Sequence, residues 1–84
     1  MQFGWDEANI GHVAEHGVSP AEVQEAFAND PLQLDSYVRN LERRYAMAGI
    51  TDAGRVLMVV FTVNETGTVR VVTAHESRKL RRHF

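Results

Sequence analysis

The sequence of 84 residues contains no cysteine. This absence excludes a disulfide framework, a thiolate zinc site and a cysteine nucleophile. Long apolar runs are also missing, since none approaches the roughly 20 residues that a membrane-spanning helix needs. The N-terminus lacks the basic start and apolar stretch of a secretory signal. There is no glycine-rich phosphate loop, Ser-His-Asp set or dinucleotide fingerprint. We therefore expect a cytoplasmic protein without membrane contact or bound cofactor.

The composition is that of a small folded protein. Hydrophobic residues make up 44% of the chain and charged residues 24%, which suits a packed domain and not a disordered segment. A chain of this length has no room for a second core. We expect one domain over residues 1–84.

Basic residues are scarce in the first half of the chain. Residues 1–42 hold eight acidic side chains and one basic, a net charge of −7, while residues 43–84 hold eight basic and three acidic, a net charge of +5. The total is −2. This asymmetry can create a basic patch for an anionic partner. It can equally reflect acidic helices packed against a basic sheet, and both interpretations remain open.

The most regular stretch lies near the C-terminus. Val56–Val63 is almost continuously apolar, as in a strand buried on both faces. Asn64–Thr68 is a polar turn with a glycine, and Val69–Ala74 follows as a second strand. The pattern predicts a β-hairpin at the centre of a sheet, with His75 at its end. Strict alternation would place Val69, Val71, Thr73 and His75 on one face, and Arg70, Val72 and Ala74 on the other.

Two helices are expected in the first third of the chain. Asp6 is a candidate N-cap for a helix over Asp6–His16, and Ser19-Pro20-Ala21-Glu22 is a capping box that starts a second helix. Asn29-Asp30-Pro31 ends this second helix. The helical spacing predicts two buried faces, one of Ile10, Val13, Ala14 and Gly17 and one of Val23, Ala26 and Phe27.

Three further strands complete the expected fold. They are Gln2–Trp5 at an edge, Leu32–Tyr37, and Arg43–Ile50. Consecutive strands with short turns imply an antiparallel meander. We predict an α+β fold with a small, mainly antiparallel sheet of four or five strands, the helical pair on one face, and a short C-terminal helix. In that helix Leu80 and Phe84 would dock on the domain.

The segment His12–His16 has the spacing H-x-x-E-H, which some metalloproteases use on a helix. Two histidines at i and i+4 can share a face and bind zinc. Here the pair lies opposite the predicted apolar face, and no third ligand follows it in the sequence. We therefore favour a solvated helix face and expect no metal site.

Three sites could carry chemistry. Glu42 and Arg44 share a strand face, as an ion pair or as a carboxylate beside a phosphate-binding fork. His75 could be a general acid or base, although a lone histidine is more often structural. The tail could offer a basic face for phosphates or a merely solvated one, and its cations are Arg78, Lys79, Arg81 and Arg82.

The order of several motifs resembles the BrnT family of toxins over essentially the whole chain. The motifs are F-x-W-D-E-x-N, E-H-G-V-S, N-D-P, E-R-R-Y-x-x-x-G, G-R-V-L-M-V-V-F-T and R-V-V-T-A. The resemblance implies a RelE-like fold and a metal-independent ribonuclease. It also implies neutralisation by a small DNA-binding antitoxin, so the expected partners are RNA and a ribbon-helix-helix protein, with a homodimer or a toxin–antitoxin hetero-oligomer.

The resemblance also implies residue roles. The family's E-x-R pair falls on Glu42 and Arg44, and its R-(I/V)-(I/V)-S-A segment on Arg70–Ala74. The implied reaction is attack by the ribose 2′-OH, with Arg44 stabilising charge and His75 or Glu42 transferring protons. RNA would be held by Arg70, Arg78, Lys79, Arg81 and Arg82.

The sequence departs from the resemblance at His75, where family members usually carry arginine. We expect the last strand to set His75 near Arg44 across the sheet. The alternative function is an inactive or non-enzymatic binding module of the same fold, which binds an antitoxin or inhibits a protein target.

Overall fold

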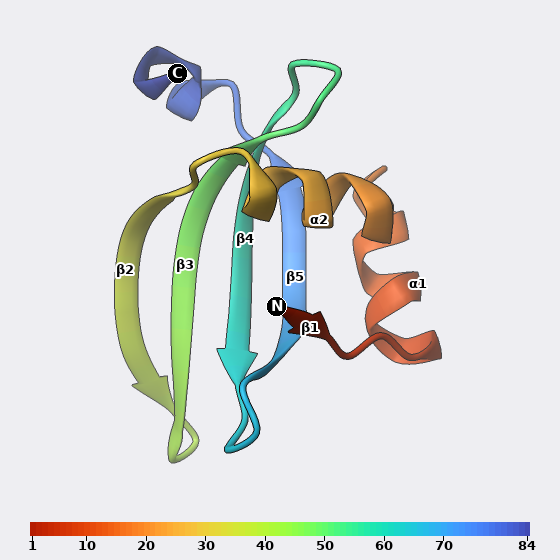
Figure 1. Cartoon of the computed structure of the whole chain (residues 1–84), viewed down its shortest axis with the longest axis vertical. Helices are drawn as coiled ribbons and strands as arrows, with labels where there is room; N and C mark the ends of the chain where they lie inside the picture. The colour runs from red at the N-terminus through yellow and green to blue at the C-terminus, as the bar shows by residue number, and fades with distance from the viewer.

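The computed structural model describes residues 1–84 and contains one five-stranded sheet with the order β1-β5-β4-β3-β2 (Figure 1). The α+β class and the predicted order of elements are confirmed. The elements are β1 (Gln2–Phe3), α1 (Glu7–Glu15), α2 (Pro20–Ala28), β2 (Leu32–Arg39), β3 (Glu42–Ile50), β4 (Val56–Val63), β5 (Thr68–Glu76) and the 3₁₀ helix η1 (Lys79–His83). Neither α-helix is long enough or apolar enough to cross a membrane.

The sheet is mixed, and the prediction of a mainly antiparallel sheet was wrong. β2, β3, β4 and β5 are joined by hairpins, which force neighbouring strands to run in opposite directions. No hairpin joins β1 to β5. They pair in parallel, with Phe3 opposite Val69, because both helices and three strands intervene between them in the chain.

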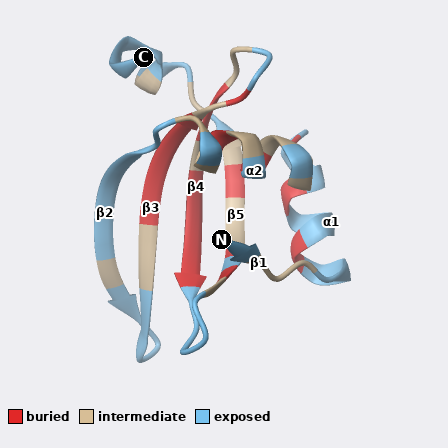
Figure 2. Ribbon diagram, in the orientation of Figure 1, coloured by how far each residue is buried: buried red, intermediate tan, exposed pale blue.

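β4 is the central strand and is buried along most of its length (Figure 2). This confirms the prediction for Val56–Val63. The side of β4 that faces α2 carries Leu57, Val59 and Phe61. The core cluster adds Val69, Val71 and Ala74 from β5, Met47 from β3, and Val13, Val18, Val23 and Ala26 from the helical region. Alternation leaves Met58, Val60 and Thr62 on the opposite side, which we call the far face.

α2 crosses the sheet over β3 and β4 (Figure 1). The predicted capping box is present, with the Ser19 hydroxyl accepting a hydrogen bond from the Glu22 backbone N–H at 3.2 Å. The closest approach to the sheet is at Gly49, where an added Cβ would lie 2.6 Å from the carbonyl oxygen of Ala26. Only glycine allows the helix to lie so close to β3.

α1 lies along the edge of the sheet beside β5, and not on its face (Figure 1). Its N-cap is Asp6, as predicted. Its buried side matches the predicted one only at Val13. Asn9 is buried as well, whereas Ile10 is 41% exposed and Ala14 and Gly17 are also exposed. A helix at an edge covers only a narrow stripe of its surface, so the remaining apolar side chains face solvent.

A β-bulge in β5 changes which side chains share a face. Val60 pairs with Thr73 and Phe61 with Val71, so Val72 is an extra residue on β5. After the bulge, Ala74 joins the core on the α2 side, while Thr73 and His75 turn to the far face. The predicted strict alternation was therefore wrong beyond Val71.

The C-terminal segment forms a short 3₁₀ helix, η1. Leu80 is half-buried, but Phe84 is 45% exposed and does not dock as predicted. The tighter 3₁₀ turn removes the i, i+4 alignment that the prediction assumed. Arg81 holds η1 to the β3–β4 turn by donating from Nη1 to the carbonyl oxygen of Gly54 at 2.6 Å.

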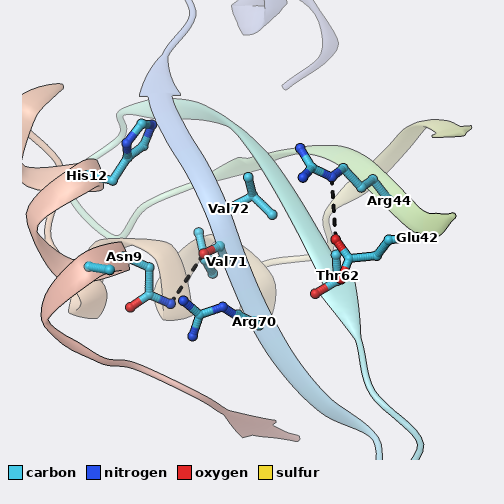
Figure 3. Close-up of a pocket in the computed structure, with 9 residues that line it drawn as sticks. Asn9, His12, Glu42, Arg44, Thr62, Arg70, Val71 and Val72 are labelled. Carbon is cyan, nitrogen blue, oxygen red and sulfur yellow. Dashed lines mark hydrogen bonds and ion pairs between the residues drawn. The ribbon is translucent and has the colours of Figure 1, made fainter. Parts of the chain in front are cut away.

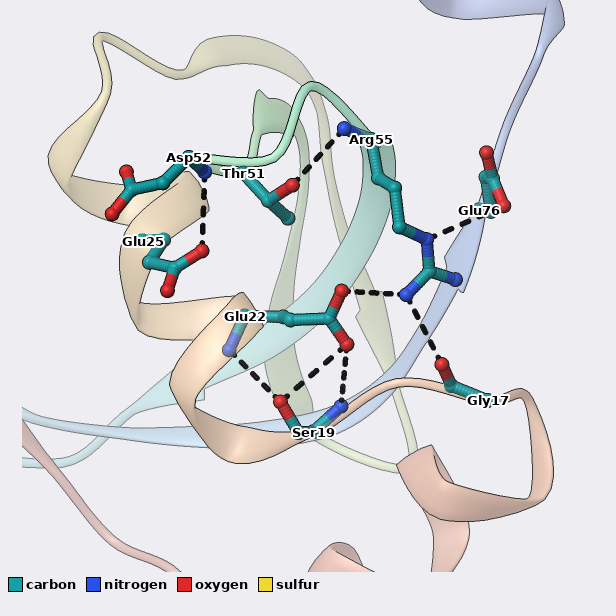
Figure 4. Close-up of polar contacts among 8 residues, drawn as sticks. All are labelled: Gly17, Ser19, Glu22, Glu25, Thr51, Asp52, Arg55 and Glu76. Atoms are coloured by element: carbon teal, nitrogen blue, oxygen red, sulfur yellow. Dashed lines mark hydrogen bonds and ion pairs between the residues drawn. The ribbon is translucent and has the colours of Figure 1, made fainter.

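Arg55, directly before β4, connects the helices to the last strand (Figure 4). Its Nη1 donates to Glu22 Oε2 at 2.6 Å and to the Gly17 carbonyl at 3.1 Å, and its Nε to Glu76 Oε1 at 3.4 Å. Burial alone raises the pKa of the Glu22 carboxyl, but the Arg55 and Ser19 hydrogen bonds bring that pKa below its ordinary value of 4.5. The hydrogen bond to Glu22 raises the pKa of Arg55.

Replacing Glu22 by glutamine should lower the free energy of unfolding by about 1 kcal/mol at neutral pH. Because the folded-state pKa is lowered, the carboxylate stabilises the fold above pH 4.5 and loses this contribution as the pH falls through the folded-state value. Urea unfolding across a series of pH values should show the difference from wild type shrinking in acid. Glu65→Gln, in the exposed β4–β5 turn, is the control. A difference that grows in acid would contradict the prediction.

Candidate functional site

Arg44 of β3, Thr62 of β4 and Arg70 of β5 lie side by side on the far face of the sheet (Figure 3). Thr62 pairs with Arg70, and Tyr45 pairs with Phe61, so Arg44 comes level with Thr62. All three point away from the core side, which is occupied by Tyr45, Phe61 and Val71. The register of β3, β4 and β5 therefore sets Arg44 and Arg70 on either side of Thr62.

These residues line a pocket of about 360 Å³ between the sheet and α1. α1 forms one wall, and the β3 pair Glu42 and Arg44 forms the other (Figure 3). The lining residues are Ala8, Asn9, His12, Glu42, Arg44, Thr62, Arg70, Val71 and Val72. The pocket thus combines two guanidinium groups with a carboxylate and an imidazole.

Arg44 is only partly occupied by protein partners. Its Nε lies 3.6 Å from Glu42 Oε1, an ion pair beyond hydrogen-bond distance. Nε is buried and has no hydrogen-bond partner, and the Arg44 side chain is 21% exposed. An unpaired buried guanidinium nitrogen is costly. A ligand with anionic oxygens would remove this cost, because the guanidinium fork fits phosphate geometry.

Arg70, on the other side of the pocket, is held by Asp6. Its Nη1 lies 2.6 Å from Asp6 Oδ2, and both side chains are about half exposed. The Arg70 hydrogen bond is the main reason why the pKa of the Asp6 carboxyl is lowered. Asp6 also caps α1 through the Asn9 backbone N–H at 2.9 Å. The start of α1 and the position of Arg70 are therefore fixed together.

Asn9 fastens α1 to the edge of β5. Its Nδ2 donates to the carbonyl oxygen of Val71 at 3.3 Å and to that of Gly4 at 3.0 Å. Its Oδ1 accepts from the Asp6 backbone N–H at 2.8 Å. A buried polar side chain with three such contacts holds the wall of the pocket against the bulged strand.

Asn9→Ala should lower the free energy of unfolding by about 1–3 kcal/mol, because two carbonyl oxygens at the strand edge lose their donor. Chemical denaturation measures the loss. The control is Ile10→Ala at the neighbouring, 41% exposed position, where we expect a change within about 0.5 kcal/mol. The opposite ranking of the two variants would mean that the sequence-predicted helix face was right after all.

The structure brings together only some of the residues proposed from the sequence. Glu42, Arg44 and Arg70 line one pocket. His75 does not: it pairs with Met58, which pairs with Ala48, four residues along β3 from Arg44. The expectation that His75 lies near Arg44 was wrong, because the register of the strands could not be known from the sequence. The tail cations Arg78, Lys79, Arg81 and Arg82 are exposed and outside the pocket.

His12 lines the pocket although the sequence analysis did not assign it to this site. Its signal was the H-x-x-E-H spacing, which we interpreted as a solvated helix face. His12 is indeed exposed, but it lines the pocket between α1 and the sheet. No three histidine, aspartate or glutamate side chains are arranged to hold a metal ion.

Comparison with family models matches residues 5–80 to the ribonuclease toxin BrnT of type II toxin–antitoxin systems. The chain belongs to the BrnT family. The match covers α1, α2 and the four long strands, and hence every residue of the pocket. Membership in this BrnT toxin family implies an RNA target and an antitoxin partner. A comparison with curated proteins found no match.

Proposed function

We propose that this BrnT-family chain cleaves RNA in the far-face pocket without a metal ion, by attack of the ribose 2′-OH on the adjacent phosphorus. The observation that carries the proposal is Arg44, which lines the pocket and whose buried Nε has no hydrogen-bond partner. A phosphate between Arg44 and Arg70 would pair with both guanidinium groups and offset the cost of the unpaired Nε. It would also place two cations where charge develops in the pentacovalent transition state.

Two further groups can move the protons of this reaction. Glu42, beside Arg44, takes the proton of the 2′-OH as the new O2′–P bond forms. His12, on the α1 wall, donates a proton to the leaving O5′ as the P–O5′ bond breaks. The products are a 2′,3′-cyclic phosphate and a 5′-hydroxyl. His12 thereby takes the proton-transfer role that the sequence analysis gave to His75.

The binding partner that silences this pocket is, in our proposal, a small ribbon-helix-helix antitoxin. The second half of the chain supplies the RNA-facing cations, with Arg78, Lys79, Arg81 and Arg82 outside the pocket. Their exposed positions on and beside η1 suit contacts to backbone phosphates.

The experiment is an RNA cleavage assay on the protein freed from its co-expressed antitoxin, in buffer containing EDTA. We expect cleavage that continues in EDTA, products that end in a 2′,3′-cyclic phosphate, and no cleavage of 2′-O-methyl RNA. Loss of cleavage in EDTA, or cleavage of the 2′-O-methyl substrate, would contradict the proposed chemistry. In cells that express the protein without its antitoxin, growth arrest with intact RNA would instead favour inhibition of a protein target.

A further inference from the structure

Three histidines form a row that begins at the pocket and runs along the seam between α1 and β5. The ring centroids of His12 and His16 are 5.7 Å apart, and those of His16 and His75 are 6.2 Å apart. His12 lines the pocket and is exposed, as is His16, and His75 is half-buried. We call these three residues the histidine row.

Two features of the tertiary structure, neither of which has a local sequence signal, bring the three histidines together. The bulge at Val72 turns His75 to the far face, and the position of α1 at the sheet edge brings His16 to the end of β5. Four regular steps of about 3.3 Å separate Arg70 from His75 along β5, which is roughly 13 Å. The row therefore starts at the pocket and reaches well beyond it.

The row has arginines near both ends, because Arg70 lines the pocket at the His12 end and Arg78 follows β5 in the chain. After His75, the residues Glu76 and Ser77 lead to Arg78 and to the basic segment of η1. The nearest carboxylate on β5, Glu76, points to the other side of the sheet, where its Oε1 is paired with Arg55 Nε at 3.4 Å. The carboxylate of Asp6 is likewise engaged, by Arg70. Glu76 and Asp6 thus do not compete for the imidazole N–H groups, whereas Glu15, beside His16 on α1, is exposed and has no ion-pair partner.

We propose that the histidine row is a second RNA subsite, which holds the backbone next to the reacting phosphate. This inference rests on the proposed function, since it assumes that RNA is the ligand of the far face. Imidazole N–H groups donate to phosphate oxygens, and the rings offer faces on which unstacked bases stack. His75 then binds the strand outside the pocket and takes no part in the chemistry.

The test compares the binding of a short and a long RNA, both fully 2′-O-methylated so that they cannot be cleaved. A dinucleotide reaches only the pocket, whereas a strand of about ten nucleotides also covers the row. Fluorescence anisotropy in EDTA at fixed salt gives the two dissociation constants. For the variant His16→Ala/His75→Ala we expect binding of the long RNA to weaken by about 5–10-fold, from one or two lost hydrogen bonds, with dinucleotide binding unchanged.

A gain of affinity provides a second readout that a folding defect cannot imitate. His75→Arg adds a permanent cation at the end of the row. It should strengthen binding of the long RNA and increase the salt dependence by about one phosphate contact. Gln33→Ala is the matched control, because Gln33 pairs with Met47 and therefore lies on the α2 side of the sheet. This control should change the binding of neither RNA.

Several results would overturn the inference. If the double histidine variant binds both RNAs as wild type does, the row is not a subsite. If the double variant weakens binding of the dinucleotide as much as binding of the long RNA, His75 acts within the pocket. If its effect needs added Zn²⁺ and vanishes in EDTA, the histidines hold a metal and not the RNA. Failure of the proposed function is distinguishable, since wild-type protein would then bind the long RNA through the row but leave unmodified RNA intact.

Discussion

Arg44→Ala should reduce the rate of RNA cleavage by about 10²–10³-fold, the usual loss when one group that stabilises transition-state charge is removed. The reason is the geometry around Arg44, whose Nε is buried, unpaired and 3.6 Å from Glu42 Oε1. The fold should survive, because the side chain makes no hydrogen bond in the structure. A single-turnover cleavage assay, together with thermal unfolding, separates the two effects.

The chain offers a matched control in the next residue. Arg43 points to the opposite side of β3, where its Nη1 donates to the Ser36 hydroxyl at 3.2 Å. Arg43→Ala removes the same charge from the same strand and should leave cleavage nearly unchanged. Arg44→Lys should restore little, since an ammonium group cannot replace the guanidinium fork. Equal losses for Arg43→Ala and Arg44→Ala would mean that only the general positive charge matters.

Gly49→Ala should destabilise the protein by about 3 kcal/mol, near the upper end for an overpacked site. The added Cβ would lie 2.6 Å from the Ala26 carbonyl oxygen and 2.8 Å from its Cβ. The backbone of β3 at Gly49 and the backbone of α2 at Ala26 leave no room for this atom. α2 must therefore move away from β3 and expose part of the core. For a domain of this size we expect a fall in melting temperature of roughly 10–20 °C, measurable by calorimetry.

Gly11→Ala is the natural control for this prediction. It makes the same substitution in α1, where an added Cβ meets nothing within 4 Å. Alanine is the better helix former, so stability should rise by about 0.5–1 kcal/mol. If Gly49→Ala were as stable as wild type, α2 would have to pack farther from β3 than the structure places it.

Features set by neighbouring residues could be predicted from the sequence. The capping box at Ser19, the turn around Gly67 with its positive φ of 84°, and the buried strand Val56–Val63 all depend on short-range rules. Glu42 and Arg44 were paired correctly for the same reason, because they lie two residues apart on one strand. Their ion pair of 3.6 Å is a local consequence of strand alternation.

Features set by tertiary packing could not be predicted. Nothing in Val71-Val72-Thr73 signals a bulge, since no glycine or proline stands there. The bulge nevertheless reverses the faces of every residue after it, including His75. The burial of Asn9 also has no local signal, because it depends on the carbonyl of Val71, 62 residues away. The register across three strands decided which residues share the pocket, and so separated His75 from Arg44.

The parallel pairing of β1 with β5 has a consequence for how the protein is made. β5 is the last strand of the sheet in sequence, yet it lies between β1 and β4 and carries Arg70. While the ribosome is still synthesising the chain, β1 cannot pair with the sheet and α1 cannot be held at its edge, because the β1–β5 pairing and the hydrogen bond from Asn9 to Val71 need residues from Thr68 onward. Such long-range contacts form late and slowly. A growing chain therefore carries no assembled pocket until nearly all of it has been translated.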